Sequence, residues 1–265
     1  MAGRVITRYL WWVRPLARVW RAVFERYHGK VLSLEDTQKI LTLDEEIVAT
    51  SEANRSIIPF QYAYKIILKD PDHIVVMDCP CKKATGAPAD TINSCIAIGK
   101  DIGRFWLENC KKYNPRRITQ AEALELVRRL RERGHLNQAF FKVATGGSSV
   151  GVLCSCHPET CVSLIASRLT QRFDKSVSQV SPSGYSVRRA EGLCRDCGTC
   201  GRVCPFGSVT HSEGRHVYRK SECMGCGLCV EKCPSGALSL YQDPEKVLPL
   251  DVDVVRERFA DKGRK

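Results

Sequence analysis

The sequence predicts an α+β protein with an N-terminal amphipathic helix, a mixed α/β cysteine-rich domain and a small C-terminal domain that carries a duplicated cysteine motif. Its 265 residues are 43% hydrophobic and 26% charged, a globular composition that excludes overall disorder. Short β-branched runs alternate with amphipathic segments in the middle of the chain. All 15 cysteines follow residue 78. We expect domain boundaries at 1–44, 45–182, 183–243 and 244–265, the last range being a tail.

The cysteine content bears on the compartment and on the chemistry. No stretch of about 18 apolar residues is present, so we expect no membrane-spanning helix, and the start of the chain lacks the apolar core of a secretory signal. A cytoplasmic protein follows, and the cytoplasm keeps thiols reduced. Fifteen cysteines in that compartment indicate metal binding or catalysis rather than a disulfide framework.

The N-terminal segment is basic and aromatic. Residues 1–30 contain seven Arg and Lys residues and one acidic residue, Glu25, so this segment carries half of the net charge of +12. It also contains three of the four tryptophans. This mixture over residues 4–27 is typical of a helix lying in a membrane interface, so we expect peripheral contact with the inner face of the cell membrane. Docking on a partner protein or packing on the protein's own core are the alternatives. No nucleic-acid-binding motif occurs, and no nucleic-acid partner is expected.

The strongest motif is duplicated near the C-terminus. A C-x2-C-x2-C-x3-C-P pattern occurs twice, 29 residues apart (Cys194 to Cys223), and ends at Pro205 and Pro234. With this spacing three cysteines wrap one face of an iron–sulfur cube, and the fourth points away and binds the other cluster. We therefore expect two metal sites, the first held by Cys194, Cys197, Cys200 and Cys233, and the second by Cys223, Cys226, Cys229 and Cys204.

Residues 185–243 closely resemble the bacterial two-[4Fe-4S] ferredoxin domain, and all eight ligand positions match. The resemblance implies two [4Fe-4S] clusters, one-electron transfer, and two pseudo-symmetric halves that each contain a short hairpin and a helix. Zinc is the alternative metal, but a zinc site takes four ligands in two pairs, which is a different pattern.

A second set of cysteines lies in the middle of the chain. Residues 73–78 and 150–153 are β-branched runs that we interpret as buried strands, and each ends directly in a Cys-x-Cys sequence. A helix is expected over 157–172. Because binding sites collect at the carboxyl ends of strands, these cysteines are expected to face one another across a cleft. The candidate ligands are Cys79, Cys81, Cys95, Cys154, Cys156 and Cys161.

Four readings of this set stay open. The first reading is a third iron–sulfur cluster, which needs only four of the six cysteines. The other three readings are a zinc or other metal site, a dithiol or disulfide redox centre, and inert buried cysteines. Cys110 is expected to be a packing residue, and His157 is a candidate ligand or hydrogen-bond donor at the site. The other histidines are expected to be structural: His28, His73, His135, His211 and His216. No nucleophile–base arrangement or dinucleotide fingerprint occurs, so catalytic residues are unknown.

Residues 55–240 also resemble uncharacterised ferredoxin-domain iron–sulfur proteins of anaerobes that have an N-terminal Cys-Pro-Cys domain. The matching pieces are DCPCKK at 78–83, CIAIG at 95–99, RRITQAEALELV at 116–127 and LCSC at 153–156. In those proteins the second cysteine group is denser than CSCHPETC. The resemblance implies no particular reaction.

Three further elements are expected. Thr119 and Glu122 form a capping box that opens an amphipathic helix, which Gly134 ends. A helix is expected over about 58–68, and a strand over 140–144.

The function expected from the sequence is electron transfer in an anaerobic redox pathway. Single electrons would pass through the two ferredoxin-type clusters and a third cluster, to or from a larger oxidoreductase. The alternative is an oxidoreductase whose cysteine cleft holds a cluster or dithiol that reacts with substrate.

Overall fold

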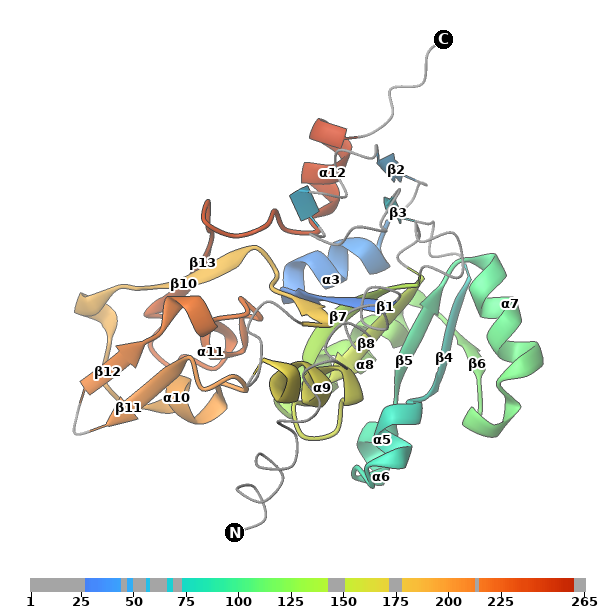
Figure 1. The fold of residues 1–265 in the computed structure, drawn as a ribbon, viewed down its shortest axis with the longest axis horizontal. Helices are drawn as coiled ribbons and strands as arrows, with labels where there is room; N and C mark the ends of the chain where they lie inside the picture. Colours follow the sequence, from blue (N-terminus) through green and yellow to red (C-terminus); the bar gives the residue numbers. More distant parts are fainter. Residues whose placement is uncertain are drawn as a thin grey trace, which may run out of the picture.

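The computed structural model describes residues 27–43, 47–49, 56–57, 66–68, 73–142, 151–171, 178–212 and 215–259. Within these ranges a seven-stranded sheet forms the centre, and a smaller lobe with the duplicated motif packs beside it (Figure 1). The strands, in their order across the sheet, are β6 (Arg116–Ile118), β4 (Ile74–Asp78), β5 (Asn93–Ile98), β8 (Val152–Cys156), β7 (Leu136–Lys142), β1 (Tyr27–Leu32) and β9 (Val180–Ser181).

The direction of the strands decides where the cysteines meet. β5 is antiparallel to both of its neighbours, β4 and β8, so β4 and β8 run in the same direction. The carboxyl ends of β4 and β8 and the start of β5 therefore lie at one edge of the sheet. The expected strands are present at 74–78 and 152–156, but β8 continues through Cys154 and Cys156 instead of ending before them.

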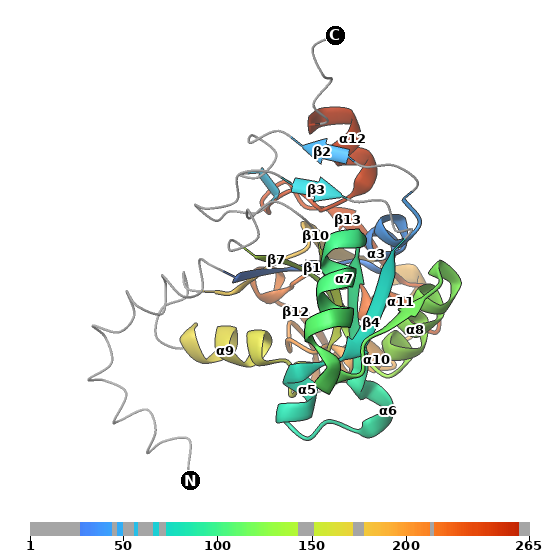
Figure 2. The ribbon, with the colours of Figure 1, turned by 90° about the vertical axis from the view of Figure 1, so that its right-hand side faces the viewer.

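Alternating side chains cover the two faces of the sheet with two separate apolar cores. The first core contains Val76, Ile96 and Leu153 and is covered by α3 (Leu34–Leu41), α8 (Gln120–Glu132) and α12 (Val252–Phe259). The second core contains their strand neighbours Met77, Cys95 and Cys154 and is covered by α7 (Lys100–Asn109) and α9 (Val162–Thr170). Figure 2 shows α7 and α8 on opposite sides of β4. This period of two places cysteine side chains in a buried face.

Helix α8 forms as the sequence predicts. Thr119 and Glu122 make a reciprocal capping box, in which the Thr119 amide donates to the Glu122 carboxylate over 2.7 Å. The helix ends before Gly134, whose φ of 82° suits glycine and few other residues. Its buried face, which includes Ala123, Val127 and Leu130, lies in the first core.

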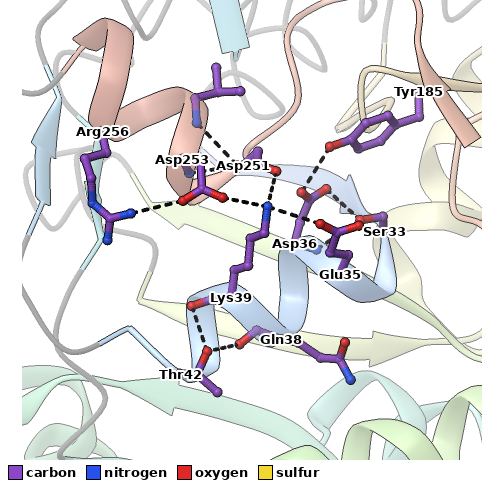
Figure 3. Close-up of polar contacts among 11 residues, drawn as sticks. Ser33, Glu35, Asp36, Gln38, Lys39, Thr42, Tyr185, Asp251, Asp253 and Arg256 are labelled. Carbon is purple, nitrogen blue, oxygen red and sulfur yellow. Dashed lines mark hydrogen bonds and ion pairs between the residues drawn. The ribbon is translucent and has the colours of Figure 1, made fainter.

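Residues 27–43 and 250–259 pack with the central sheet, although the expected boundaries place them in an N-terminal segment and a tail. The sheet begins at Tyr27, inside the range 1–44 that is expected to be a separate segment. Likewise α12 lies inside the expected tail, but Val252 and Val255 are buried in the first core. Lys39 of α3 anchors this helix, with Nζ at 2.9 Å from Asp251 and 2.8 Å from Asp253 (Figure 3). Apolar burial and ion pairing together explain why residues 250–259 are part of the domain.

The same corner joins the sheet to the small lobe. Asp36 of α3 is buried and accepts hydrogen bonds from Ser33 Oγ (2.8 Å) and from Tyr185 Oη (3.2 Å), and Tyr185 belongs to the lobe (Figure 3). Burial raises the pKa of Asp36 to about 6, because the charged carboxylate loses its hydration.

Other expectations need correction. The range 66–68 of the expected helix is strand β3 (Ile66–Leu68), which pairs with β2 (Ile47–Ala49), as β-branched residues favour. The helix expected over 157–172 begins only at Val162, because residues 158–160 form a turn. Strand β7 begins at Leu136, four residues before the expected strand. Residues 1–26, the expected amphipathic helix, and 58–65 lie outside the described residues.

The small lobe consists of two similar halves. Its elements are the pair β10 (Tyr185–Arg189) and β13 (Leu238–Gln242), the pair β11 (Val209–Ser212) and β12 (Arg215–Tyr218), and the short helices α10 (Thr199–Val203) and α11 (Leu228–Glu231). The α+β fold class predicted from the sequence is confirmed. Among the residues that the structure describes, no helix combines the length and apolar character needed to cross a membrane.

Candidate metal centres

The six middle cysteines meet at one edge of the sheet. Cys79 follows β4, Cys81 lies in the short helix α5 (Pro80–Ala84), and Cys95 sits in β5 directly opposite Cys154 of β8. Cys156 ends β8, and Cys161 precedes α9 as its N-cap residue. All six line one cavity of about 780 Å³. The topology thus brings together all six cysteines that the sequence predicted to meet, although the first and last of them, Cys79 and Cys161, are 82 positions apart in the chain.

The thiols form an unbroken series across the cavity. Electrostatic interactions between neighbouring thiols follow the order Cys81, Cys79, Cys95, Cys154, Cys156 and Cys161. Cys95 and Cys154 are within hydrogen-bond distance, with Sγ atoms 3.0 Å apart. Five of the six are buried, and Cys81 is half-buried.

The thiols of this series differ in how readily they ionise. Hydrogen bonds from Cys81 and Cys95 hold the pKa of Cys79 well below its ordinary value, and hydrogen bonds from Cys154 and Cys161 lower the pKa of Cys156 to about 5. The same hydrogen bond to Cys156, together with burial, raises the pKa of Cys154. Ionised and protonated thiols therefore stand side by side, and the ionised ones are suited to bind metal.

Backbone amides also favour thiolates at the rim of the cavity. The amide of Lys82 donates to the Cys79 sulfur, that of Val162 to Cys81 and that of Leu164 to Cys161. These donors lie in the first turns of α5 and α9, where unpaired N–H groups point outward. The loops that follow β4 and β8 thus stabilise negative sulfur at three positions.

A buried cation lies beside the thiols. Lys82 is 1% exposed, and its Nζ donates to the carbonyl of Thr91 (2.8 Å) and contacts Nδ1 of His135 (3.0 Å). Burial lowers the pKa of Lys82, which the neighbouring Cys156 and Cys79 thiolates oppose. Burial and then Lys82 lower the pKa of His135 to about 4, so this imidazole is neutral near pH 7. His135 does not line the cavity, and its contacts with Lys82 and the Ser155 carbonyl are consistent with the predicted structural role.

Two observations test whether this cavity suits a cluster. Ser163 Oγ is buried, lines the cavity and has no hydrogen-bond partner among the described residues. No three Cys, His, Asp or Glu side chains in the described part of the chain are placed to hold a single metal ion. A [4Fe-4S] cluster takes one thiolate per iron around a core larger than one zinc ion, and a cavity of about 780 Å³ lined by six cysteines has room for such a core. The His157 ring lies near that of His135, with centroids 5.3 Å apart and planes tilted by 53°, and His157 does not line the cavity.

The duplicated motif forms two further cavities in the small lobe. The first is lined by Cys194, Cys197, Cys200 and Cys233, and the second by Cys204, Cys223, Cys226 and Cys229. Each cavity therefore takes three cysteines from one half and the fourth from the other half. This grouping equals the two ligand sets predicted from spacing; that these thiols bind metal stays a prediction.

Glycines let the backbone fold tightly around these cavities. Gly198 and Gly227, with φ of 69° and 80°, begin α10 and α11 in the left-handed region. At Gly225 an added Cβ would lie 2.2 Å from Ser183 Oγ and 2.4 Å from the carbonyl oxygen of Tyr185. Any larger residue at 225 would push the second half away from β10.

The sequence interpretation missed two histidines at the first cavity. His211 and His216 lie opposite each other on β11 and β12, and both line this cavity. Their Nε2 atoms are buried and have no hydrogen-bond partner among the described residues. The hairpin pairing of two histidines five residues apart was the signal that could have revealed them.

The two lobe cavities differ in their surroundings. Cys197 at the first is exposed, while Cys223, Cys226 and Cys229 at the second are buried. Arg131 of α8 reaches the second one: its guanidinium donates to the carbonyl of Cys226 over 2.7 Å and pairs with Glu231. Cys110 caps the C-terminal end of α7 and lines none of the three cavities, which is consistent with a packing role.

Comparison with known proteins supports the interpretation of the small lobe. Residues 186–234 match the family model described as the 4Fe-4S dicluster domain. No curated protein matches the chain. The chain therefore contains a ferredoxin-type [4Fe-4S] domain, and iron–sulfur electron transfer is the activity that this domain supports.

Proposed function

We propose that the protein transfers single electrons between the two ferredoxin-type sites and a third metal–sulfur centre in the six-cysteine cavity. One observation carries the proposal: the six cysteines that line this cavity share the second apolar core with Cys226 of the ferredoxin-type domain. Bound [4Fe-4S] clusters supply the one-electron chemistry. The chain supplies the thiolates, the buried surroundings and the path between them.

A continuous set of contacts joins the second lobe cavity to the six-cysteine cavity. Arg131 contacts the Cys226 carbonyl and donates to Asn137 Oδ1 over 2.9 Å. Asn137 then donates to Ser155 Oγ over 3.1 Å, and Ser155 stands between Cys154 and Cys156. Leu228 and the cavity cysteines pack in the same apolar core. This packing keeps water out of the space between the two sites and supports exchange of electrons between them.

The first lobe cavity is the side from which an external redox partner would be reached. Cys197 is exposed, and Leu193 and Val217, 58% and 44% exposed, are large apolar side chains of the same half of the domain. An exposed cluster site with apolar surface nearby suits transient docking of a protein. We therefore propose a larger oxidoreductase as partner and contact through this half.

Metal analysis of the anaerobically purified chain tests the third centre. About twelve irons with matching acid-labile sulfide are expected, and about eight would mean that only the ferredoxin-type sites are filled. Cys156→Ser should lose about four irons, while the matched Cys110→Ser should lose none. A wild-type content of eight irons without zinc would refute the third centre, and an unchanged iron content in Cys156→Ser would exclude Cys156 as a ligand.

The alternative function is an oxidoreductase that acts on a small molecule in the six-cysteine cavity. The size of the cavity, about 780 Å³, lies in the range of ligand pockets, and α7 adds apolar walls through Ile102 and Trp106. A pure electron carrier has no need for such a pocket. Perturbation of the spectrum of the reduced protein by small molecules, abolished in Trp106→Ala but not in Phe105→Ala at the exposed rim, would favour this alternative.

The N-terminal segment provides the proposed membrane contact. Residues 4–27 carry tryptophan and arginine in the pattern of an interfacial helix. The full chain should co-sediment with vesicles that contain anionic lipid, and a chain starting at Tyr27, which keeps all of β1, should not. Salt should weaken the binding without abolishing it, since apolar burial is not screened. Equal behaviour of both chains would refute membrane contact.

A further inference from the structure

We infer that Cys95 and Cys154 form a redox-active dithiol–disulfide pair, flanked by a metal site that Cys79, Cys81, Cys156 and Cys161 hold. The cavity would then accept two electrons at sulfur as well as single electrons at metal. The inference divides the six thiols into four ligands and one pair, and it rests on the proposed function only for the origin of the electrons.

The geometry of the pair is that of two thiols ready to join. Cys95 and Cys154 are direct partners on adjacent antiparallel strands, where Cα atoms lie about 4.5–5.5 Å apart. A disulfide spans Cα distances of about 4.4–6.8 Å, so the bond needs no movement of either strand. Their Sγ atoms are already 3.0 Å apart, and no shorter distance between cysteine sulfurs is measured among the described residues.

Strand position separates this pair from the other four cysteines. Cys95 and Cys154 are each the third residue of a central strand, and ladder pairing on both sides fixes their backbone. Cys79, Cys81 and Cys161 lie outside the strands, and Cys156 is the last residue of β8. These four can turn around a metal core. Three of them also receive backbone N–H bonds, which Cys95 and Cys154 lack among their principal contacts.

The redox step balances within the proposed activity. Two thiols lose two protons and two electrons as the S–S bond forms: Cys95–SH + Cys154–SH → Cys95–S–S–Cys154 + 2 H⁺ + 2 e⁻. Two one-electron iron–sulfur carriers take up the electrons, and water takes up the protons. The reverse step breaks the S–S bond and restores both thiols. A chain with one-electron carriers thus gains a two-electron couple in its interior.

The sequence makes the pair easy to trap. Trypsin places Cys95 alone on residues 84–100, Cys110 alone on 105–111, and Cys154 on 143–168 together with Cys156 and Cys161. The full-length holoprotein is poised anaerobically with ferricyanide or with dithionite, denatured in excess N-ethylmaleimide, digested and analysed by mass spectrometry. We expect 84–100 linked to 143–168 in the oxidised sample and both peptides alkylated in the reduced one. The Cys110 peptide should be alkylated in both.

Variants assign the partner and separate this inference from the proposed function. Cys154→Ser should abolish the link, whereas Cys161→Ser should keep it. Cys95→Ser should retain the iron content of wild type, while Cys156→Ser loses about four irons. Full alkylation of the Cys95 peptide in both redox states, or iron loss in Cys95→Ser, would overturn the dithiol pair and leave the third centre standing. A linked pair in a wild-type protein with only about eight irons would refute the third centre and leave the pair standing.

Discussion

The two halves of the ferredoxin-type domain have the same cysteine spacing but different surroundings. In the first half Cys197 is exposed and the cavity is bordered by the hairpin histidines 211 and 216. In the second half three cysteines are buried, and Arg131 of the sheet domain reaches their backbone. The comparison shows that a sequence repeat determines how the cysteines are grouped, whereas the domain packed on one half determines the exposure and charge around them. We expect the first half to face a partner and the second to face the six-cysteine cavity.

The largest effect is expected from exchanging the fourth cysteine of either half. Cys204→Ser should remove about four irons from the site otherwise built by the second half, because Cys204 lines that cavity. Cys233→Ser should do the same to the first site. Electron paramagnetic resonance of the reduced variants distinguishes which signal is lost. Loss of the first-half signal in Cys204→Ser would show that the cysteines do not cross over.

Removal of Arg131 should affect the second half more than the first. Arg131→Met leaves the partly exposed Glu231 carboxylate and the buried Cys226 carbonyl and Asn137 Oδ1 without their partner, and each buried acceptor left unsatisfied costs about 1–3 kcal/mol. The thermal midpoint should fall by roughly 2–4 °C per kcal/mol. Loss of the positive charge should also lower the midpoint potential of the second-half site and leave the first unchanged.

Arg128→Met is the matched control for Arg131. It lies on the same helix and pairs with Glu125 and Glu132 in solvent, so it should change neither quantity noticeably. Equal shifts of both potentials in Arg131→Met would mean that Arg131 acts through overall stability and not through its contact with the second half.

The smallest effect is expected at the corner where β10 meets α3. Burial raises the pKa of Asp36 from 3.8 to about 6, so the folded protein binds a proton more tightly than the unfolded chain. The stabilisation is complete below about pH 4 and is lost as the pH rises through 6. Relative to Asp36→Asn, wild type should lose up to about 3 kcal/mol between pH 4 and pH 7.

Anaerobic thermal melts of both proteins across this pH range measure the effect of Asp36. Lys30 and Asp251 face the same corner and interact with Asp36, so the difference between the two melts reports the titration of Asp36 together with its coupling to these two groups. A difference that stays constant with pH would show that Asp36 is ionised in the folded protein.

The sequence could predict what depends on local spacing. The grouping of the ferredoxin-type cysteines follows from cysteines separated by two and three intervening residues, and the capping box at Thr119 defines α8. The convergence of the six cysteines was predicted from two strands ending in Cys-x-Cys, although β5 runs between those strands in the opposite direction. The mainly antiparallel order of the sheet was not predicted, because strand pairing depends on contacts between distant residues.

The parts that the sequence did not predict depend on tertiary packing. His135 and Arg131 have no motif, and Lys82 lies in DCPCKK without any local sign that it is buried beside Cys156 and His135. The packing of α12 against α3 was missed for the same reason. Its buried apolar residues, Val252 and Val255, are few, and Asp251 lies 212 residues after its partner Lys39 in the sequence.

The register of β5 against β8 has a consequence for how the holoprotein is assembled. Cys95 and Cys154 meet only after 59 residues of chain have closed into adjacent strands, and such non-local closure is entropically costly and slow. Three thiols of each ferredoxin-type site, in contrast, lie within seven residues, so arriving metal can shape those loops directly. The six-thiol cavity therefore exists only in a chain whose sheet is complete. We therefore expect metal to enter this cavity after the ferredoxin-type sites, once the sheet has folded.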